Sequence, residues 1–239
     1  MPEAHQYDLT LFGASGRTGI DILNQATDRG LKVLAIDHSM PDEPEARKGI
    51  EHRTADVLED DLAPLVADSA AVISALGVAF SPKTAIDPPP LYSKGTGRII
   101  AAMKEAGRDR LCVISAAFAA ERANLPLWFE QTVVRALGSI LEDMREMEEA
   151  LRSSSLNWTA ARPGWLLDRP RTQSYHVSTE NLPDGAFRTR HGDLAHFLIE
   201  CALHGDHGKS APFLARRESK PDESPAALGK ETLSMIGLA

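Results

Sequence analysis

The residues of this chain whose types and spacing point most directly to chemistry lie between positions 13 and 19. They read Gly13-Ala14-Ser15-Gly16-Arg17-Thr18-Gly19 and directly follow an apolar run at 8–12. In a strand–turn–helix unit, the first glycine permits a tight turn, the second lets the backbone approach a diphosphate, and the third lets the helix pack close to the strand. The helix start offers free N–H groups and a positive dipole end to the anion. The pattern therefore predicts a site for the phosphates of a dinucleotide.

The order of the remaining elements predicts the sheet that must position this turn. A helical pattern runs from the turn to Gly30, and an apolar strand follows at 31–36. Further strands are predicted at 50–57, 70–77, 110–115, 156–161 and 211–215, and further helices at 62–65, 92–107, about 132–152 and 193–203. Alternation of strand and helix is typical of parallel sheets covered on both faces. We therefore expect an α/β fold, a Rossmann-like doubly wound parallel sheet.

Length and composition limit the classes of protein that remain. The 239 residues predict one domain over residues 1–215, with a small substrate-covering part at 164–215 and a polar tail at 216–239. The net charge of −8 argues against nucleic-acid binding, which depends on clustered Lys and Arg. Only two cysteines occur, Cys112 and Cys201, and both fall in predicted buried elements. A disulfide framework is therefore not expected.

Targeting and partners are predicted from the same composition. The first residues lack the pattern of a signal peptide, and no apolar run approaches the length of a membrane span. We expect a soluble, cytoplasmic protein with a small-molecule substrate and without a membrane or nucleic-acid partner, and the oligomeric state stays open. The histidines His191, His196, His204 and His207 show no recognised zinc spacing, so no metal is expected.

Several motifs, in order along the chain, support a more specific assignment. They are the glycine turn at 13–19, Ala55-Asp56-Val57, Ser74-Ala75-Leu76-Gly77, Ser115-Ala116-Ala117-Phe118, Leu151-Arg152 with Ser154, Trp158-Thr159, Arg162-Pro163-Gly164 and Asp193-Leu194-Ala195. Together they make the chain resemble the atypical short-chain dehydrogenases/reductases with an NAD(P)H-binding fold, especially biliverdin reductase B, also called flavin reductase. The resemblance covers roughly residues 7–215, and NmrA-like proteins are further relatives.

This resemblance implies a role for each matching position. The phosphates would be held by Gly13, Ser15, Gly16, Arg17, Thr18 and Gly19. The adenine would be bordered by Asp56 and Val57, the ribose and the approach to the nicotinamide would be lined by Ala75, Leu76 and Gly77, and the nicotinamide would be flanked by Pro163, Gly164 and Trp165. These positions also agree with an expectation that does not depend on the resemblance. Each lies where a parallel strand ends, and open α/β sheets bind their ligands at these ends.

The chain departs from the wider superfamily in its proton-transfer residues. Tyr7, Tyr92 and Tyr175 each lack a lysine four residues on, so the Tyr-x-x-x-Lys pair that oxidises alcohols is absent. We therefore expect hydride transfer from NAD(P)H to an electron-poor acceptor such as a flavin, a quinone or a linear tetrapyrrole, with protons from water. The alternatives are an NmrA-like redox sensor that binds the dinucleotide without catalysis, and a reductase or isomerase specific to one pathway.

The residues around the acceptor are less closely defined. Ser115, at the tip of the fifth strand, is the candidate catalytic residue, because its hydroxyl could bond the nicotinamide carboxamide or a substrate oxygen. The alternative is a strand-end serine that bonds the backbone. Arg162 contacts the substrate or forms an ion pair that shapes its loop. Trp128, Phe129 and Trp165 form an apolar wall for a planar acceptor or belong to the core.

The choice between NADH and NADPH depends on the end of the second strand. Relatives that prefer NADPH carry an arginine where this chain has Ile36, and Asp37 follows it. A carboxylate there can bond a ribose 2′-hydroxyl and repel a 2′-phosphate, which favours NADH. Arg17 could instead reach a 2′-phosphate, with His38 and Ser39 as further donors. On the resemblance we expect NADPH to be preferred, with NADH possible.

Overall fold

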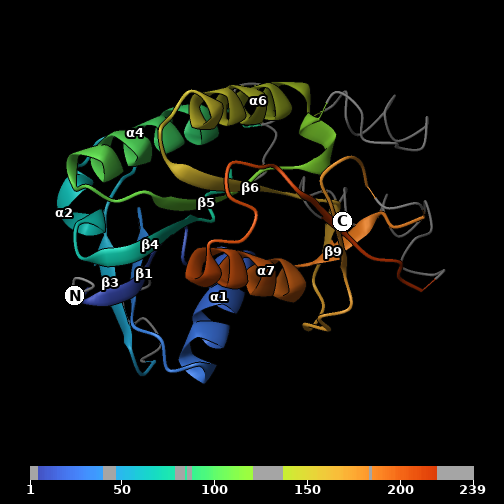
Figure 1. Ribbon diagram of the computed structural model, residues 1–239, viewed down its shortest axis with the longest axis horizontal. Coiled ribbons are helices and arrows are strands. Elements are labelled where there is room, and N and C mark those ends of the chain that lie inside the picture. Colours follow the sequence, from blue (N-terminus) through green and yellow to red (C-terminus); the bar gives the residue numbers. More distant parts are fainter. Residues whose placement is uncertain are drawn as a thin grey trace.

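The computed structural model describes residues 5–39, 47–78, 84, 88–120, 137–182 and 185–219. An eight-stranded sheet in the order β3-β2-β1-β4-β5-β6-β10-β8 forms its centre (Figure 1). Its strands are β1 (Tyr7–Phe12), β2 (Val33–Asp37), β3 (Ile50–Thr54), β4 (Ser69–Ser74), β5 (Arg110–Ile114), β6 (Asn157–Pro163), β8 (His176–Ser178) and β10 (Phe213–Ala215). All neighbouring strands of this sheet pair in parallel except β10 and β8. The predicted Rossmann-like α/β fold is therefore confirmed.

Helices cover both faces of the sheet. They are α1 (Arg17–Asp28), α2 (Ala63–Val66), α4 (Leu91–Glu105), the short 3₁₀ helix η1 (Ala117–Ala119), α6 (Gly138–Arg152) and α7 (His191–His204). The helices α4 and α6 lie on one face, and α1 and α7 lie on the other (Figure 1). A strand between two such layers is apolar on both sides, because successive side chains point to opposite faces. In β5, Leu111 and Val113 join the core under α4 and α6, whereas Cys112 joins the core under α1 and α7.

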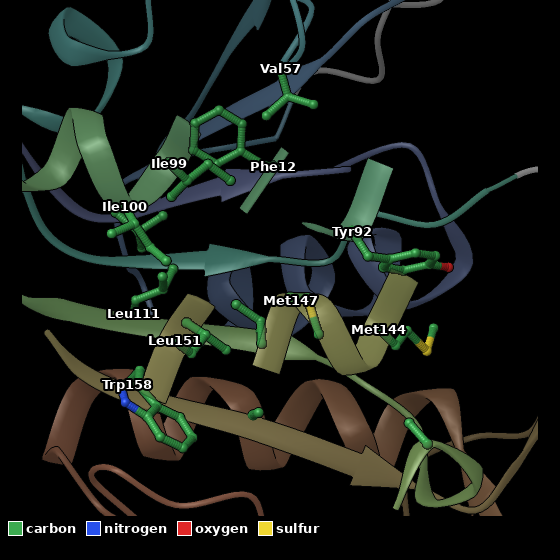
Figure 2. Close-up of a cluster of buried hydrophobic side chains, with 14 of the residues drawn as sticks. Phe12, Val57, Tyr92, Ile99, Ile100, Leu111, Met144, Met147, Leu151 and Trp158 are labelled. Atoms are coloured by element: carbon green, nitrogen blue, oxygen red, sulfur yellow. The ribbon is translucent and has the colours of Figure 1, made fainter. Parts of the chain in front are cut away.

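The core under α4 and α6 is the larger of the two. Figure 2 shows Ile99 and Ile100 of α4 and Met144, Met147 and Leu151 of α6 among its side chains. These residues recur at helical spacing, so each helix presents an apolar stripe to the sheet. At the start of α4, the carboxylate of Asp143 in α6 accepts hydrogen bonds from the Tyr92 and Ser93 N–H groups at 2.8 and 3.1 Å. The two helices are thus held together at the sheet edge where parallel strands keep their ligands.

Three short strands were not expected from the sequence. They are β7 (Trp165–Leu167), β9 (Arg188–Arg190) and β8, which has three residues as well. The strands β7 and β9 pair in parallel as a separate two-stranded sheet. Such segments carry no periodicity of their own, so their pairing depends on contacts distant in sequence. They belong to the stretch predicted to cover the substrate, a role that stays a prediction.

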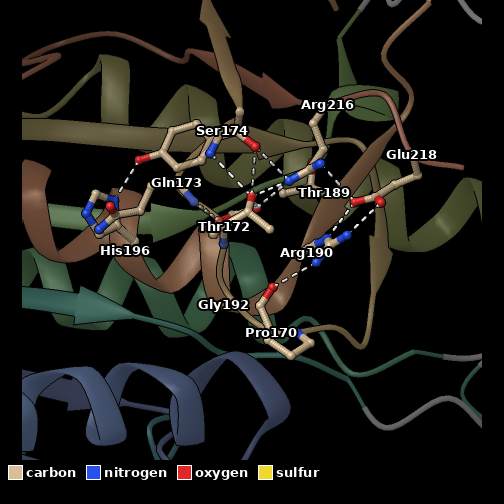
Figure 3. Close-up of polar contacts among 12 residues, drawn as sticks. Pro170, Thr172, Gln173, Ser174, Thr189, Arg190, Gly192, His196, Arg216 and Glu218 are labelled. Atoms are coloured by element: carbon tan, nitrogen blue, oxygen red, sulfur yellow. Dashed lines mark hydrogen bonds and ion pairs between the residues drawn. The ribbon is translucent and has the colours of Figure 1, made fainter.

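Polar contacts hold the residues after this stretch against β9 (Figure 3). Arg190 of β9 donates from Nε and Nη2 to the two carboxylate oxygens of Glu218, at 2.6 and 2.8 Å. Arg216 also pairs with Glu218, at 2.9 Å. Residues 216–219 therefore lie against the domain, and the rest of the predicted tail lies outside the described residues. No helix in the described part of the chain is long and apolar enough to cross a membrane.

Candidate coenzyme site

The glycine turn joins β1 to α1 and has room for glycine alone at two positions. Gly13 has a φ of +78°, and a Cβ there would lie 2.5 Å from the Ala75 carbonyl oxygen at the end of β4. A Cβ on Gly19 would overlap the carbonyl oxygen of Gly13. At Gly16 the only atom of the described residues that a Cβ would meet is the Gly13 oxygen, at 3.4 Å. The turn is therefore packed on its inner side and open at Gly16, which suits the approach of a ligand.

The first turn of α1 presents a positive end without an internal counter-charge. Among the described residues, none caps this helix through its side chain, and the first turn contains no acidic residue. The N-terminal amides of a helix lack intrahelical acceptors, and their dipole favours an anion. A dinucleotide diphosphate supplies both the acceptors and the charge. The residues present therefore fit this coenzyme.

Asp37 lies beside the turn, because β2 pairs with β1 in a register that places Ile36 next to Phe12. Its side chain is only 9% exposed. The carboxylate accepts hydrogen bonds from the N–H and the hydroxyl of Ser15, at 2.8 and 2.5 Å, and from the His38 N–H at 2.9 Å. The structure therefore brings Ser15, expected at the phosphates, together with Asp37 and His38, expected at the ribose, with a negative charge at their centre.

Arg17 and Thr18 contact residues that the sequence did not associate with the turn. Arg17 forms an ion pair with Asp168, which follows β7, and both side chains are exposed. A hydrogen bond of 2.8 Å joins the Thr18 hydroxyl to Nδ1 of His191, the first residue of α7. Burial lowers the pKa of His191 to about 4, the nearby Arg17 adds to this effect, and Asp168 opposes it. The imidazole is therefore neutral at pH 7.

The residues predicted to border adenine and ribose gather at the ends of β3 and β4. Val57 and Leu76 both lie against Gly95 of α4, where an added Cβ would be 3.3 Å from either side chain. Nothing described lies within 4 Å of a Cβ placed on Gly77. The Asp56 carboxylate accepts from the Leu58 N–H at 2.8 Å and so closes its own turn. Because Phe12 pairs with Ser74 and Asp37 pairs with Thr54, the residues that follow β3 and β4 lie at the same end of the sheet as the glycine turn.

An aromatic cluster lies beside the residues predicted to flank the nicotinamide. The Trp165 ring is 6.1 Å from that of Phe118, which in turn is 5.9 Å from Phe187. Before it, the Gly164 N–H donates to the Leu214 carbonyl and the Thr189 hydroxyl, at 3.1 and 2.9 Å. The sequence predicted Trp165 here but missed Phe118 and Phe187, which lie in segments without a regular pattern. Trp128 and Phe129 lie outside the described residues.

Ser115, the candidate catalytic residue, is buried at the end of β5. Its hydroxyl donates to Oε1 of Glu148, a buried residue of α6, at 2.8 Å. Arg162 donates from Nε and Nη2 to the two oxygens of the same carboxylate, at 2.9 and 2.5 Å, and Arg152 donates to Oε2 at 2.9 Å. Of the two readings of Arg162, the geometry supports the ion pair. While its hydroxyl donates to Glu148, Ser115 has no second proton to donate to a substrate, but its oxygen can still accept a hydrogen bond.

A cavity of about 660 Å³ lies beside this ion pair. Its described lining includes Glu148 and Arg162, further charged residues of α6, and Phe213 of β10. None of the glycine-turn residues belongs to that lining. The cavity is therefore separate from the predicted diphosphate site.

Comparison with known proteins agrees with this geometry. Residues 13–205 match the NAD(P)H-binding family. The chain belongs to this family. Its sequence is 25% identical over 213 residues to the uncharacterised Bacillus subtilis (strain 168) protein YwnB, covering 82% of this chain and 92% of that protein.

Solved structures share the fold at lower identity. A candidate NADH-flavin reductase from Streptococcus pneumoniae TIGR4 superposes with a TM-score of 0.68 at 23% identity, covering 88% of this chain and all of the other. A short-chain dehydrogenase/reductase from Veillonella parvula DSM 2008, in complex with NADP, superposes with a TM-score of 0.73 at 15% identity, covering 92% of this chain and all of the other. The family match confirms the NAD(P)H-binding family expected from the sequence, and the solved structures share the fold of this chain.

Proposed function

We propose that this protein is a reductase that transfers a hydride from NADH to an electron-poor, planar acceptor such as a flavin or a quinone. The observation that carries the proposal is the first turn of α1, which is open at Gly16 and has no side-chain cap among the described residues. The diphosphate would bind this turn, and the nicotinamide would lie toward Gly164 and Trp165. When bound, the coenzyme supplies the hydride, and a proton from water completes reduction of the acceptor.

The surroundings of Asp37 support NADH as the coenzyme. Asp37, expected beside the ribose 2′ position, already accepts hydrogen bonds from the N–H and the hydroxyl of Ser15. A 2′-phosphate would have to displace a carboxylate that repels it, whereas a 2′-hydroxyl can donate to that carboxylate. Arg17, expected to reach a 2′-phosphate, pairs with Asp168 instead. Membership of the NAD(P)H-binding family does not distinguish NADH from NADPH. On the contacts of Asp37 and Arg17 we therefore propose NADH, in place of the NADPH expected on the resemblance.

The nature of the acceptor is inferred from what surrounds the nicotinamide position. Phe118 and Trp165 are buried in the core at this end of the sheet, and the partly buried Phe187 packs against them. An apolar aromatic cluster with one partly exposed ring suits a flat, conjugated molecule. The chain has no Tyr-x-x-x-Lys pair, and the Ser115 proton is held by Glu148. Acceptors that take a hydride and then a proton from water need no such donor. Flavins and quinones meet this requirement.

Loss of NADH absorbance with a panel of flavins, quinones and linear tetrapyrroles tests the proposal. Oxidation should occur with at least one class, and Gly16→Glu should abolish it, because the new carboxylate would stand where the diphosphate binds. Gly97→Glu is the matched control and should keep the activity, because a Cβ on this residue of α4 meets no described atom within 4 Å. Absence of oxidation with every class would contradict the proposal.

The second candidate is a dinucleotide-binding redox sensor that performs no chemistry. It is favoured by the burial of Ser115 and the use of its hydroxyl proton by Glu148. The sensor would bind NADH as tightly as the reductase but would leave it unoxidised with all acceptors. Binding and turnover measured on the same preparation therefore separate the two functions.

A further inference from the structure

His191 brings a second helix to the predicted diphosphate site. It is the first residue of α7, and its Nδ1 lies 2.8 Å from the hydroxyl oxygen of Thr18 in the first turn of α1. The helices α1 and α7 lie on the same face of the sheet (Figure 1). A neighbouring contact, from the Gln25 side-chain amide to the Gly192 carbonyl at 2.8 Å, holds the start of α7 against α1. His191 is therefore fixed beside the turn by the packing of two helices.

The charged groups around His191 come from three elements. Arg17 of α1 and Asp168 after β7, which form an ion pair with each other, both act on its charge, and Asp21, one turn further along α1, lies near Asp168. On α7 itself, the Asp193 carboxylate accepts from the N–H groups of residues 172 and 173. Burial and Arg17 keep the imidazole neutral in the coenzyme-free protein. If this neutral imidazole binds one proton, it becomes a cation that can interact favourably with a phosphate.

We propose that His191 belongs to the coenzyme site: it positions the Thr18 hydroxyl, and it takes up a proton from solvent when the dinucleotide diphosphate binds at the first turn of α1. This inference rests on the proposed function, because the diphosphate is that of the coenzyme. The diphosphate brings two negative charges to a turn that His191 already touches through Thr18. An opposite charge a few ångströms away favours the protonated form of a histidine. The imidazolium then adds a positive charge to the anion site.

The sign of the pH dependence follows from linkage. If His191 binds a proton more tightly in the complex than in the free protein, coenzyme affinity rises as the pH falls through the pKa of the complex. The gain continues until the free protein also becomes protonated, near its pKa of about 4. One linked proton changes the dissociation constant by at most tenfold for each pH unit. We expect the dissociation constant to fall about 3- to 10-fold between about pH 8 and about pH 6.

Calorimetric titration with NAD⁺ in buffers of different ionisation heat measures the proton directly. NAD⁺ is the right probe because it lacks the 2′-phosphate of NADP⁺, which itself titrates near pH 6. The wild-type protein should take up a fraction of one proton for each NAD⁺ bound. His191→Asn keeps a polar atom near the position of Nδ1 but does not titrate, so it should bind with no uptake and with little pH dependence.

His196→Asn is the matched control on the same helix. Burial lowers the pKa of His196 as well, but its Nδ1 is bonded to the Tyr175 hydroxyl at 2.9 Å rather than to the glycine turn. This variant should take up the same fraction of a proton as the wild-type protein. Thr18→Val should weaken NAD⁺ binding and retain the uptake, because it removes the positioned hydroxyl but leaves the titrating ring.

A second measurement uses the wild-type protein alone. Nuclear magnetic resonance of the His191 ring should show its pKa rising when NAD⁺ is added, so the inference can be tested even if a variant fails to fold. Binding without proton uptake, uptake that persists in His191→Asn, or a His191 pKa that does not rise would each overturn the inference alone. A wild-type protein that binds neither NAD⁺ nor NADH at any pH would overturn the proposed function as well.

Discussion

Replacing Asp37 by asparagine changes the coenzyme preference with little change in shape. The carboxylate is nearly buried and accepts two hydrogen bonds from Ser15, at 2.8 and 2.5 Å. Asparagine keeps one oxygen that can accept from the Ser15 N–H, but it removes the negative charge. The variant therefore separates the repulsion of a 2′-phosphate from the geometry of the turn.

The size of this repulsion can be bounded. Two unit charges 4 Å apart interact by about 4 kcal/mol at an effective dielectric constant of about 20, and by about 1 kcal/mol in water. Asp37 lies at the carboxyl end of β2, where its surroundings are between these two dielectric limits. We therefore expect a repulsion of about 1–3 kcal/mol. That range corresponds to a preference for NADH of about 5- to 150-fold, since about 1.4 kcal/mol is tenfold. Asp37→Asn should lose most of this preference.

Dissociation constants for NADH and NADPH, measured by calorimetry at one ionic strength, give the ratio directly. The ratio should favour NADH in the wild-type protein and approach one in Asp37→Asn, with NADH binding weakened only a few-fold. Asp28→Asn, at the far end of α1, is the control and should leave the ratio unchanged. A wild-type protein that prefers NADPH, or a ratio that the substitution leaves unaltered, would refute the reasoning.

Three further predictions concern stability and are measured by urea denaturation. Gly13→Ala should lower the free energy of unfolding by about 2–4 kcal/mol, because its Cβ would lie 2.5 Å from a backbone oxygen at a residue with positive φ. Gly97→Ala, within α4, should raise the free energy of unfolding by up to about 1 kcal/mol. Equal effects of the two substitutions would contradict this prediction. Glu148→Gln should lower the free energy of unfolding by about 3–5 kcal/mol, because it removes the buried negative charge that pairs with the partly buried Arg162. The exposed control Glu142→Gln should lower it by about 0.5 kcal/mol or less, and a similar small loss at both sites would argue against this reasoning. Because the pKa of His191 is lowered to about 4 in the folded protein, the free energy of unfolding should be about 3 kcal/mol higher above about pH 6.5 than near pH 4. This difference should be lost progressively as the pH falls toward about 4. His191→Asn should not show this loss. The same pH dependence in that variant would show that other groups are responsible.

Much of the fold could be predicted because its signals are local. The glycine turn identifies β1 and α1 from seven adjacent residues, and the apolar runs of β2, β4 and β5 and the stripes of α4 and α6 each depend on a single segment. The strands β7 and β9 could not be predicted in this way. They have three residues each, and Trp165 pairs with Arg188 across an intervening stretch of chain. Only the folded core brings such segments together.

The residues of the candidate site could likewise be located from local sequence patterns, but the partners of their side chains could not. Asp37 was singled out because it ends the second strand, about 24 positions after Gly13, where a carboxylate can meet a ribose 2′-hydroxyl. In the structure it accepts a hydrogen bond from the Ser15 N–H. His191 was considered only as a metal ligand, since its contact with Thr18 spans 173 positions and leaves no mark in the sequence. Ser115 was placed correctly at the strand end, but its bond to Glu148 could not be foreseen from β5 alone. Strand ends can be located by pattern, whereas the partners of their side chains depend on helix packing.

Calorimetric titration of the purified protein with NADH, beside Gly16→Glu and Gly97→Glu, tests the central claim most directly. The claim is that the first turn of α1 binds the coenzyme diphosphate. We expect saturable binding of NADH by the wild-type protein and by Gly97→Glu, and none by Gly16→Glu. No binding by the wild-type protein, or equal binding by all three, would contradict the account.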